Sequence, residues 1–138
     1  MQNRIGYGID VHQLKKGTPL IIGGVSISYS KGSKGHSDGD VLYHAIVDAI
    51  LGSLAQGDIG QHFPSDDIQW KDAKSTIFLK HASTLLAEKK FRIENIDTTI
   101  ILQNPKLTPH ILQMRKNISE ILSVDLDKIS IKATTTDR

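Results

Sequence analysis

Apolar residues recur at helical spacing in three stretches of the chain. The first stretch begins after Asp38 or Asp40, either of which can cap a helix, and residues 57–60 end it. Its apolar face comprises Leu42, Ile46, Ala49, Ile50 and Leu54. A second helix is predicted over residues 72–90. A third begins at Thr108-Pro109, a hydroxyl cap followed by proline at the first helical position, and continues to about residue 123.

Short apolar or alternating runs predict strands between these helices. The runs cover residues 4–10, 20–22, 25–28, 96–103 and 128–133, and Gly23-Gly24 is typical of a hairpin turn. Residues 30–39 and 61–71 are predicted as loops, the second of them mobile and at the surface. Because strands and helices mix without strict alternation, the predicted fold class is α+β.

Composition narrows the functional classes. The 138 residues suffice for one domain, 1–138, which buries about two thirds of its unfolded surface. The net charge is +2, aromatic residues make up 5%, and no basic block occurs, so no nucleic-acid partner is predicted. The sequence contains no signal-peptide pattern or membrane-spanning stretch, so no membrane partner is predicted. The absence of cysteine fits a reducing compartment, and the predicted location is the bacterial cytoplasm.

Three side chains form a candidate metal site. Asp10 and His12 follow the first predicted strand, and His44 lies in the first turns of the first helix. One carboxylate and two imidazoles with an open position are typical of catalytic rather than structural metal sites. Asp40 and Asp48, one helical turn to either side, could orient the His44 ring. The alternative interpretation is a surface histidine and a helix histidine that hydrogen-bonds to one of these aspartates.

Two further segments have chemistry suited to a phosphorylated ligand. The run 132–137 offers a lysine, three threonine hydroxyls and Asp137, which could hold a hard cation, and residues 104–106 add Lys106. A threonine run also fits an ordinary strand end. Asp58-Ile59-Gly60 suits a sugar diol, but a helix-terminating turn uses the same residue types.

The motifs taken together resemble one enzyme family. The segments GYGIDVH, IIGGV, GHSDGDVLYHA, GDIGQHFP, QNPKL, PHI and KATTTD occur in this order. The chain is similar from Arg4 to Asp137 to the family of 2-C-methyl-D-erythritol 2,4-cyclodiphosphate synthases. These lyases of the non-mevalonate isoprenoid pathway convert 4-diphosphocytidyl-2-C-methyl-D-erythritol 2-phosphate to the cyclodiphosphate and release CMP.

The resemblance assigns roles to residues of this chain. It implies that Asp10, His12 and His44 hold one Zn²⁺ per subunit, and that His36 and Thr135 stabilise the transition state. A magnesium or manganese ion is expected at the diphosphate beside Asp137. Residues 63–67 match a segment that covers the substrate, and residues 102–108 match the cytidine-binding segment. The full set of implied substrate contacts is Asp10, Val11, His12, His36, Ser37, Asp58, Ile59, Gly60, Phe63, Pro64, Ser65, Asp66, Asp67, Leu102, Gln103, Asn104, Pro105, Lys106, Leu107, Thr108, Thr134, Thr135, Thr136 and Asp137.

The resemblance also implies a fold and an assembly. The expected fold is a ferredoxin-like α/β sandwich with a four-stranded sheet and a short extra hairpin. Three copies are expected to form a homotrimer with active sites between neighbouring subunits.

The sequence departs from the family pattern in two places. Asp137 stands where the family has glutamate, one methylene longer, so a water bridge or a shifted loop is expected at the second cation. The family continues beyond the position of Arg138 with a glycine-rich turn and a final strand, and a sheet without that strand would lack an edge.

Two other functions fit parts of the sequence. A non-haem iron oxygenase also uses two histidines and a carboxylate, although usually on a β-rich barrel rather than a helix. A catalytically silent nucleotide-binding or interaction protein could keep the same scaffold.

Overall fold

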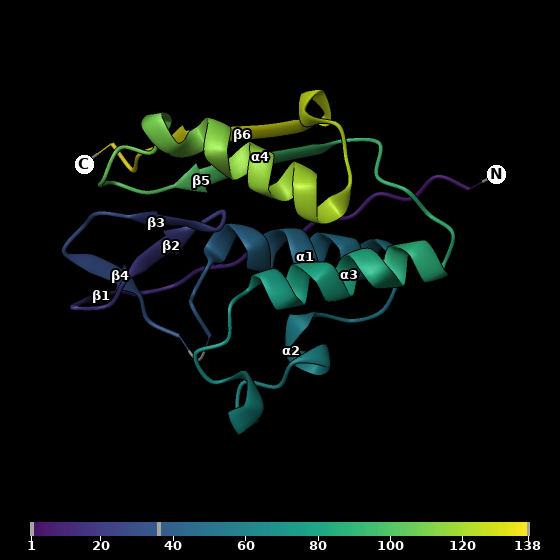
Figure 1. The fold of residues 1–138 in the computed structure, drawn as a ribbon, viewed down its shortest axis with the longest axis horizontal. Coiled ribbons are helices and arrows are strands. Elements are labelled where there is room, and N and C mark those ends of the chain that lie inside the picture. The colour runs from purple at the N-terminus through teal and green to yellow at the C-terminus, as the bar shows by residue number, and fades with distance from the viewer. Residues whose placement is uncertain (1, 36, 138) are drawn as a thin grey trace.

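Three long helices and a parallel strand pair form most of the described molecule, with two small antiparallel strand pairs at one end (Figure 1). The computed structural model describes residues 2–35 and 37–137. The helices are α1 (Val41–Ser53), α2 (Ile59–His62), α3 (Thr76–Glu88) and α4 (Ile111–Leu122). The strands are β1 (Leu14–Lys16), β2 (Leu20–Ile22), β3 (Val25–Ile27), β4 (Lys31–Ser33), β5 (Ile96–Ile101) and β6 (Ile129–Thr134). Single 3₁₀ turns cover residues 68–70, 108–110 and 126–128.

The described strands associate in pairs. β1 pairs with β4 and β2 with β3, both antiparallel, and β5 lies parallel to β6 with Ile96 opposite Ile129. The four-stranded sheet that the family resemblance implies is therefore not formed by residues 2–35 and 37–137. The mixture of helices and strands confirms the α+β class at the coarse level.

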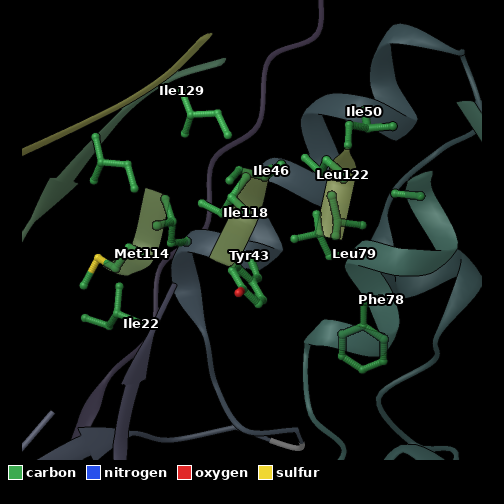
Figure 2. Packing of buried hydrophobic residues seen from close by; sticks show 14 of the residues in the cluster. Ile22, Tyr43, Ile46, Ile50, Phe78, Leu79, Met114, Ile118, Leu122 and Ile129 are labelled. Atoms are coloured by element: carbon green, nitrogen blue, oxygen red, sulfur yellow. The ribbon is translucent and has the colours of Figure 1, made fainter. Parts of the chain in front are cut away.

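The core lies where the helices meet (Figure 2). α1 packs against α3, α3 against α4, and α4 against β6. Val47, Leu79, Ala82, Met114 and Ile118 are fully buried there. The predicted apolar face of α1 is confirmed at four positions, and its fifth, Ala49, is half-buried.

The strand predicted over residues 4–10 is wrong. This segment runs as a long coil beside α1 (Figure 1), and no described strand pairs with it. Residues 2–7 are all exposed, and exposure alternates only from Gly8 onward: Gly8 and Asp10 are partly buried, whereas Ile9 and Val11 are 66% and 82% exposed. The pattern predicted which residues share a face, but a strand also needs a hydrogen-bonding partner.

Other boundaries also differ from the prediction. β4 forms inside the predicted loop 30–39, and β1 was not predicted, because a polar three-residue strand has little periodicity. The segment 61–71 contains the end of α2 and a 3₁₀ turn rather than a featureless loop. Thr108 is not a side-chain cap, although proline does occupy the start of the following turn. No helix in the described part of the chain is both long and apolar enough to cross a membrane.

Candidate metal centre and substrate site

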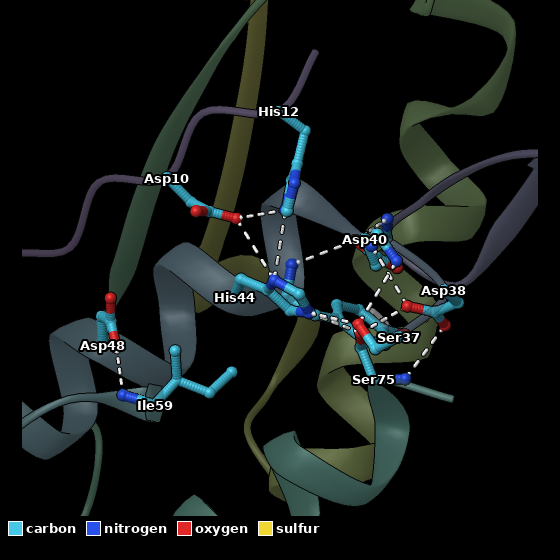
Figure 3. A network of polar contacts seen from close by, with 12 residues as sticks. Asp10, His12, Ser37, Asp38, Asp40, His44, Asp48, Ile59 and Ser75 are labelled. Atoms are coloured by element: carbon cyan, nitrogen blue, oxygen red, sulfur yellow. Dashed lines mark hydrogen bonds and ion pairs between the residues drawn. The ribbon is translucent and has the colours of Figure 1, made fainter. Parts of the chain in front are cut away.

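Asp10, His12 and His44 come together although 32 residues separate the two histidines (Figure 3). Asp10 Oδ2 lies 2.7 Å from His12 Nε2 and 3.2 Å from His44 Nδ1, and the two nitrogens are 3.3 Å apart. Three potential ligand atoms therefore surround one point, as the sequence predicted.

Two glycines let the N-terminal coil carry Asp10 to this point. A Cβ on Gly6 would lie 1.9 Å from the carbonyl oxygen of Ala49, and one on Gly8 would lie 1.9 Å from that of Ala45. Ala45 and Ala49 are one helical turn apart on α1, so alternate residues of the coil follow successive turns. Only glycine permits this approach, which places Asp10 near the N-terminal part of α1.

The Asp40 side chain holds the start of α1. Its carboxylate accepts hydrogen bonds from the backbone N–H groups of Tyr43 at 3.1 Å, Gly23 at 2.9 Å and Gly24 at 2.7 Å. It thus caps α1 and fixes the β2–β3 turn against it.

The predicted orientation of His44 by Asp40 or Asp48 is wrong. The Asp48 carboxylate accepts from the backbone N–H of Ile59 at 2.8 Å, and Asp40 is occupied by backbone amides. His44 Nε2 instead lies 2.7 Å from Ser75 Oγ and 3.3 Å from Ser37 Oγ. No sequence pattern indicates Ser75 as a partner of His44, because the contact depends on how α3 packs on α1.

The charges at the site influence one another. Burial opposes ionisation of Asp10, but His12 and His44 hold the pKa of its carboxyl well below the usual range. Contact with Asp10 raises the pKa of His12 above its ordinary value. Acid therefore favours a proton on His12, which competes with a cation for the same nitrogen. Burial raises the pKa of Asp48, and raises that of Asp40 to about 6 despite its three amide donors.

The donor set fits a zinc ion. Asp10 Oδ2 is buried and accepts no hydrogen bond of good geometry from the described residues, although both imidazoles lie close to it. An anionic oxygen in that situation is stabilised by a cation. Zn²⁺ takes carboxylate and imidazole ligands and, in catalytic sites, keeps an open position beside three protein ligands.

The segment 58–67 lies next to this centre through Asp48 and Ile59 (Figure 3). Asp58 caps the start of α2 by accepting from the backbone N–H of Gln61 at 3.0 Å, so its structural role is to begin this helix rather than to end the preceding one. Phe63 packs its ring against Phe78 and Trp70, with centroids 4.4 and 4.9 Å away. Pro64, Ser65 and Asp66 are exposed, whereas Asp67 is partly buried.

A histidine pair fastens α2 to α3. His62 and His81 lie 3.1 Å apart between Nδ1 and Nε2, and His62 Nε2 lies 2.8 Å from the carbonyl oxygen of Gln56. The beginning of the predicted covering segment is therefore tied to the helical core rather than free at the surface.

The other predicted substrate residues gather at the ends of β5 and β6. Because these strands are parallel, residues 102–108 and 134–137 leave the same edge. Gln103 Oε1 accepts from the backbone N–H and hydroxyl of Thr136 at 3.2 and 2.8 Å, and the Thr135 hydroxyl lies 3.4 Å from Asp137 Oδ1. Residues 134–137 are exposed, whereas Leu107 is buried in the core.

The structure thus gathers the predicted residues into two groups. The metal-side group comprises Asp10, His12, Ser37, His44 and residues 58–67, and the strand-end group comprises residues 102–108 and 134–137. No hydrogen bond between described residues joins the two groups. His36 lies outside the described residues, and Val11 is exposed.

Comparisons of the sequence and of the structure with known proteins identify the same family of relatives. The YgbB family model matches residues 3–138. The 2-C-methyl-D-erythritol 2,4-cyclodiphosphate synthase of Chlorobium phaeobacteroides (strain BS1) is 54% identical over 135 residues, which cover 98% of this chain and 85% of that protein.

Solved structures share the fold. The bifunctional IspDF of Campylobacter jejuni aligns with a TM-score of 0.92 and 42% identity, covering 97% of this chain and 36% of that longer one. A CDP-bound form of 2C-methyl-D-erythritol-2,4-cyclodiphosphate synthase aligns with a TM-score of 0.91 and 35% identity, covering 97% of this chain and 89% of the other. Similarity in sequence and in fold therefore extends over almost the whole chain.

Proposed function

Because the chain belongs to the YgbB family, we propose that it converts 4-diphosphocytidyl-2-C-methyl-D-erythritol 2-phosphate to 2-C-methyl-D-erythritol 2,4-cyclodiphosphate and CMP. It acts as a metal-dependent phosphorus–oxygen lyase in the formation of isoprenoid precursors by the non-mevalonate pathway. The convergence of Asp10, His12 and His44 on one point is the observation that carries the proposal.

The reaction is an internal phosphoryl transfer. An oxygen of the 2-phosphate attacks the β-phosphorus, the bond from that phosphorus to the α–β bridging oxygen breaks, and CMP leaves with the electron pair. The second pKa of a phosphate monoester is about 6, so the nucleophile is already anionic at neutral pH. The protein therefore needs to supply geometry and charge neutralisation rather than a general base.

The two residue groups divide this work. Zn²⁺ held by Asp10, His12 and His44 would supply positive charge at the β-phosphate when bound. His36 and Ser37 contact the phosphate and erythritol parts of the substrate, residues 58–60 also bind it, and residues 63–67 cover it. His36 and Thr135 stabilise the developing charge. Residues 102–108 receive the cytidine. Residues 134–137 line the diphosphate, with Mg²⁺ or Mn²⁺ beside Asp137.

We extend the proposal to a homotrimer with active sites shared between neighbouring subunits. The resemblance to the synthase family implies this assembly, and the YgbB family model matches residues 3–138. The ferredoxin-like sandwich belongs to the same proposal and is supported by the parallel β5–β6 pair with α4 packed on β6. The bacterial relatives support a bacterial source, and the cytoplasmic location stays a prediction.

The deciding experiment measures CMP release from the purified chain with Zn²⁺ and Mg²⁺, beside a His44→Ala variant. We expect turnover in the wild type and its loss in the variant. An inactive wild type that still binds CDP would favour the silent nucleotide-binding alternative. Activity that survives His44→Ala would contradict the ligand role, and turnover that requires Fe²⁺ and oxygen would favour the oxygenase alternative.

A further inference from the structure

The two ring nitrogens of His44 face different partners (Figure 3). Nδ1 faces Asp10 Oδ2 at 3.2 Å and His12 Nε2 at 3.3 Å. Nε2 faces Ser75 Oγ at 2.7 Å and, at the longer distance of 3.3 Å, Ser37 Oγ. A neutral imidazole carries one hydrogen, so one nitrogen donates and the other presents a lone pair. The position of that hydrogen decides whether His44 can bind a cation through Nδ1.

Asp38 determines the direction of the bond between Ser75 and His44. The Ser75 hydroxyl donates to Asp38 Oδ1, and the Ser75 backbone N–H donates to Asp38 Oδ2 at 2.9 Å. An ionised carboxylate only accepts hydrogen bonds, so the single hydroxyl hydrogen of Ser75 is committed to it. Ser75 Oγ can then only accept from His44, which requires the hydrogen on Nε2 and leaves the lone pair on Nδ1.

The opposite tautomer is unfavourable in this geometry. A hydrogen on His44 Nδ1 would leave Nε2 and Ser75 Oγ as two acceptors facing each other at 2.7 Å, and the Ser37 hydroxyl, the other neighbour of Nε2, is more distant at 3.3 Å. The contact of Nδ1 with Asp10 Oδ2 is longer, at 3.2 Å, and the same oxygen lies closer to His12 Nε2, at 2.7 Å. Mutual repulsion of two buried lone pairs costs more than a well-formed hydrogen bond yields.

Burial and backbone contacts make the arrangement rigid. Ser75 is 0% exposed and His44 9%, so water has little access to either group. The Asp38 backbone N–H donates to the carbonyl oxygen of Ala73 at 2.9 Å, which joins the two segments a second time. The Ser75 side chain makes no capping bond to α3, so its hydroxyl serves the contact with Asp38 and His44.

We propose that Ser75 and Asp38 are positioning residues that hold His44 in the Nε2-protonated tautomer and so direct Nδ1 toward the cation. This inference deepens the proposed function, because it rests on the metal centre formed by Asp10, His12 and His44. Hydrogen-bonded partners of this kind commonly set the affinity of a histidine ligand for its metal.

The test compares Ser75→Ala with Ser119→Ala. Ser119 is also a partly buried serine, and its hydroxyl donates to the carbonyl oxygen of Val124 at the far end of α4. Zinc affinity is measured by competition with a chromophoric chelator. The tautomer of His44 is read from ¹⁵N chemical shifts of the zinc-free protein in mildly alkaline buffer.

We expect Ser75→Ala to bind zinc about 10–100-fold more weakly and to lose the preference for hydrogen on Nε2, whereas Ser119→Ala changes neither property. Wild-type zinc affinity in Ser75→Ala, or weaker affinity with an unchanged tautomer, would overturn the proposal. An equal loss of affinity in Ser119→Ala would overturn it too, because the effect would then be general destabilisation. Neither readout depends on turnover, so failure of the CMP-release assay is distinguishable from failure of this inference.

Discussion

Replacing Gly8 by alanine is a sharp perturbation of the metal centre, although Gly8 offers no ligand. The added Cβ would lie 1.9 Å from the carbonyl oxygen of Ala45 and 2.7 Å from the backbone nitrogen of Ala49. Both are backbone atoms of α1, so no side-chain rotation relieves the contact. Ordinary contact begins near 3.4 Å, which means that the coil must retreat by about 1.5 Å.

That retreat moves Asp10, which lies two residues further along the same coil. Metal–ligand distances tolerate only about ±0.2 Å, so a displacement of that size removes the carboxylate from the centre. We expect zinc affinity to fall by at least about 10–100-fold, the loss typical of disturbing even an outer partner of a metal ligand. Forcing an extra methyl into a filled contact should also lower the free energy of unfolding by about 1–3 kcal/mol.

Chelator competition and urea unfolding measure the two effects, with Gly52→Ala as the matched control. A Cβ on Gly52 would have its nearest neighbour, the Tyr7 carbonyl oxygen, at 3.9 Å. Gly52 lies within α1, where alanine is favoured over glycine by up to about 1 kcal/mol, so the control should keep zinc and gain stability. Wild-type zinc affinity in Gly8→Ala would refute the reasoning.

Four further substitutions test separate parts of the account. Asp10→Ala should abolish CMP release while the circular dichroism spectrum stays native, and unfolding of the variant would contradict that separation. Leu79→Ala, at a fully buried position, should lower the free energy of unfolding by about 2–5 kcal/mol in urea, and a loss below about 1 kcal/mol would show that the helix interface is loosely packed. Burial and the nearby His62 lower the pKa of His81, so its contribution to stability is present above the ordinary value of 6.5 and is lost as the pH falls through the lowered pKa. Thermal unfolding between pH 7 and pH 5 should therefore show a smaller loss of stability in His81→Gln than in the wild type, and equal losses would exclude this source of acid sensitivity. Asp137→Glu should give an equal or stronger response of turnover to Mg²⁺ in titrations, whereas a large loss would show that this position differs from the family's cation site.

The sequence pattern predicted the helices and the hairpin that are determined by residues close together in the chain. α1 lies where apolar spacing and the Asp40 cap placed it, α4 follows its apolar spacing, and the β2–β3 hairpin forms at its two glycines, because these signals act within a few residues. The segment 4–10 was mistaken for a strand because its alternation reflects packing against α1 on one side only. Glycines at alternate positions fit a coil lying on a helix as well as they fit a strand.

The candidate site was predictable at its ligands but not at the groups that hold them. Asp10, His12 and His44 carry recognisable metal chemistry, and the structure brings them together. Ser75 lies 31 residues from His44 and has no unusual sequence context. The sequence favoured Asp48 as a partner of His44 because it lies one helical turn away. In the structure the Asp48 carboxylate accepts a hydrogen bond from the backbone N–H of Ile59 in α2 instead. The hydrogen-bond partners of His44 and Asp48 depend on how α2 and α3 pack on α1, and the spacing of residues in the sequence does not reveal that packing.

X-ray absorption at the zinc edge tests the central claim most directly, with the zinc-loaded wild type and His12→Ala measured side by side. The wild type should show two imidazole nitrogens at about 2.0–2.1 Å and a carboxylate oxygen at about 2.0–2.2 Å, and the variant should show one imidazole fewer. A zinc ion without imidazole ligands, or the same spectrum in both proteins, would contradict a metal centre built from Asp10, His12 and His44.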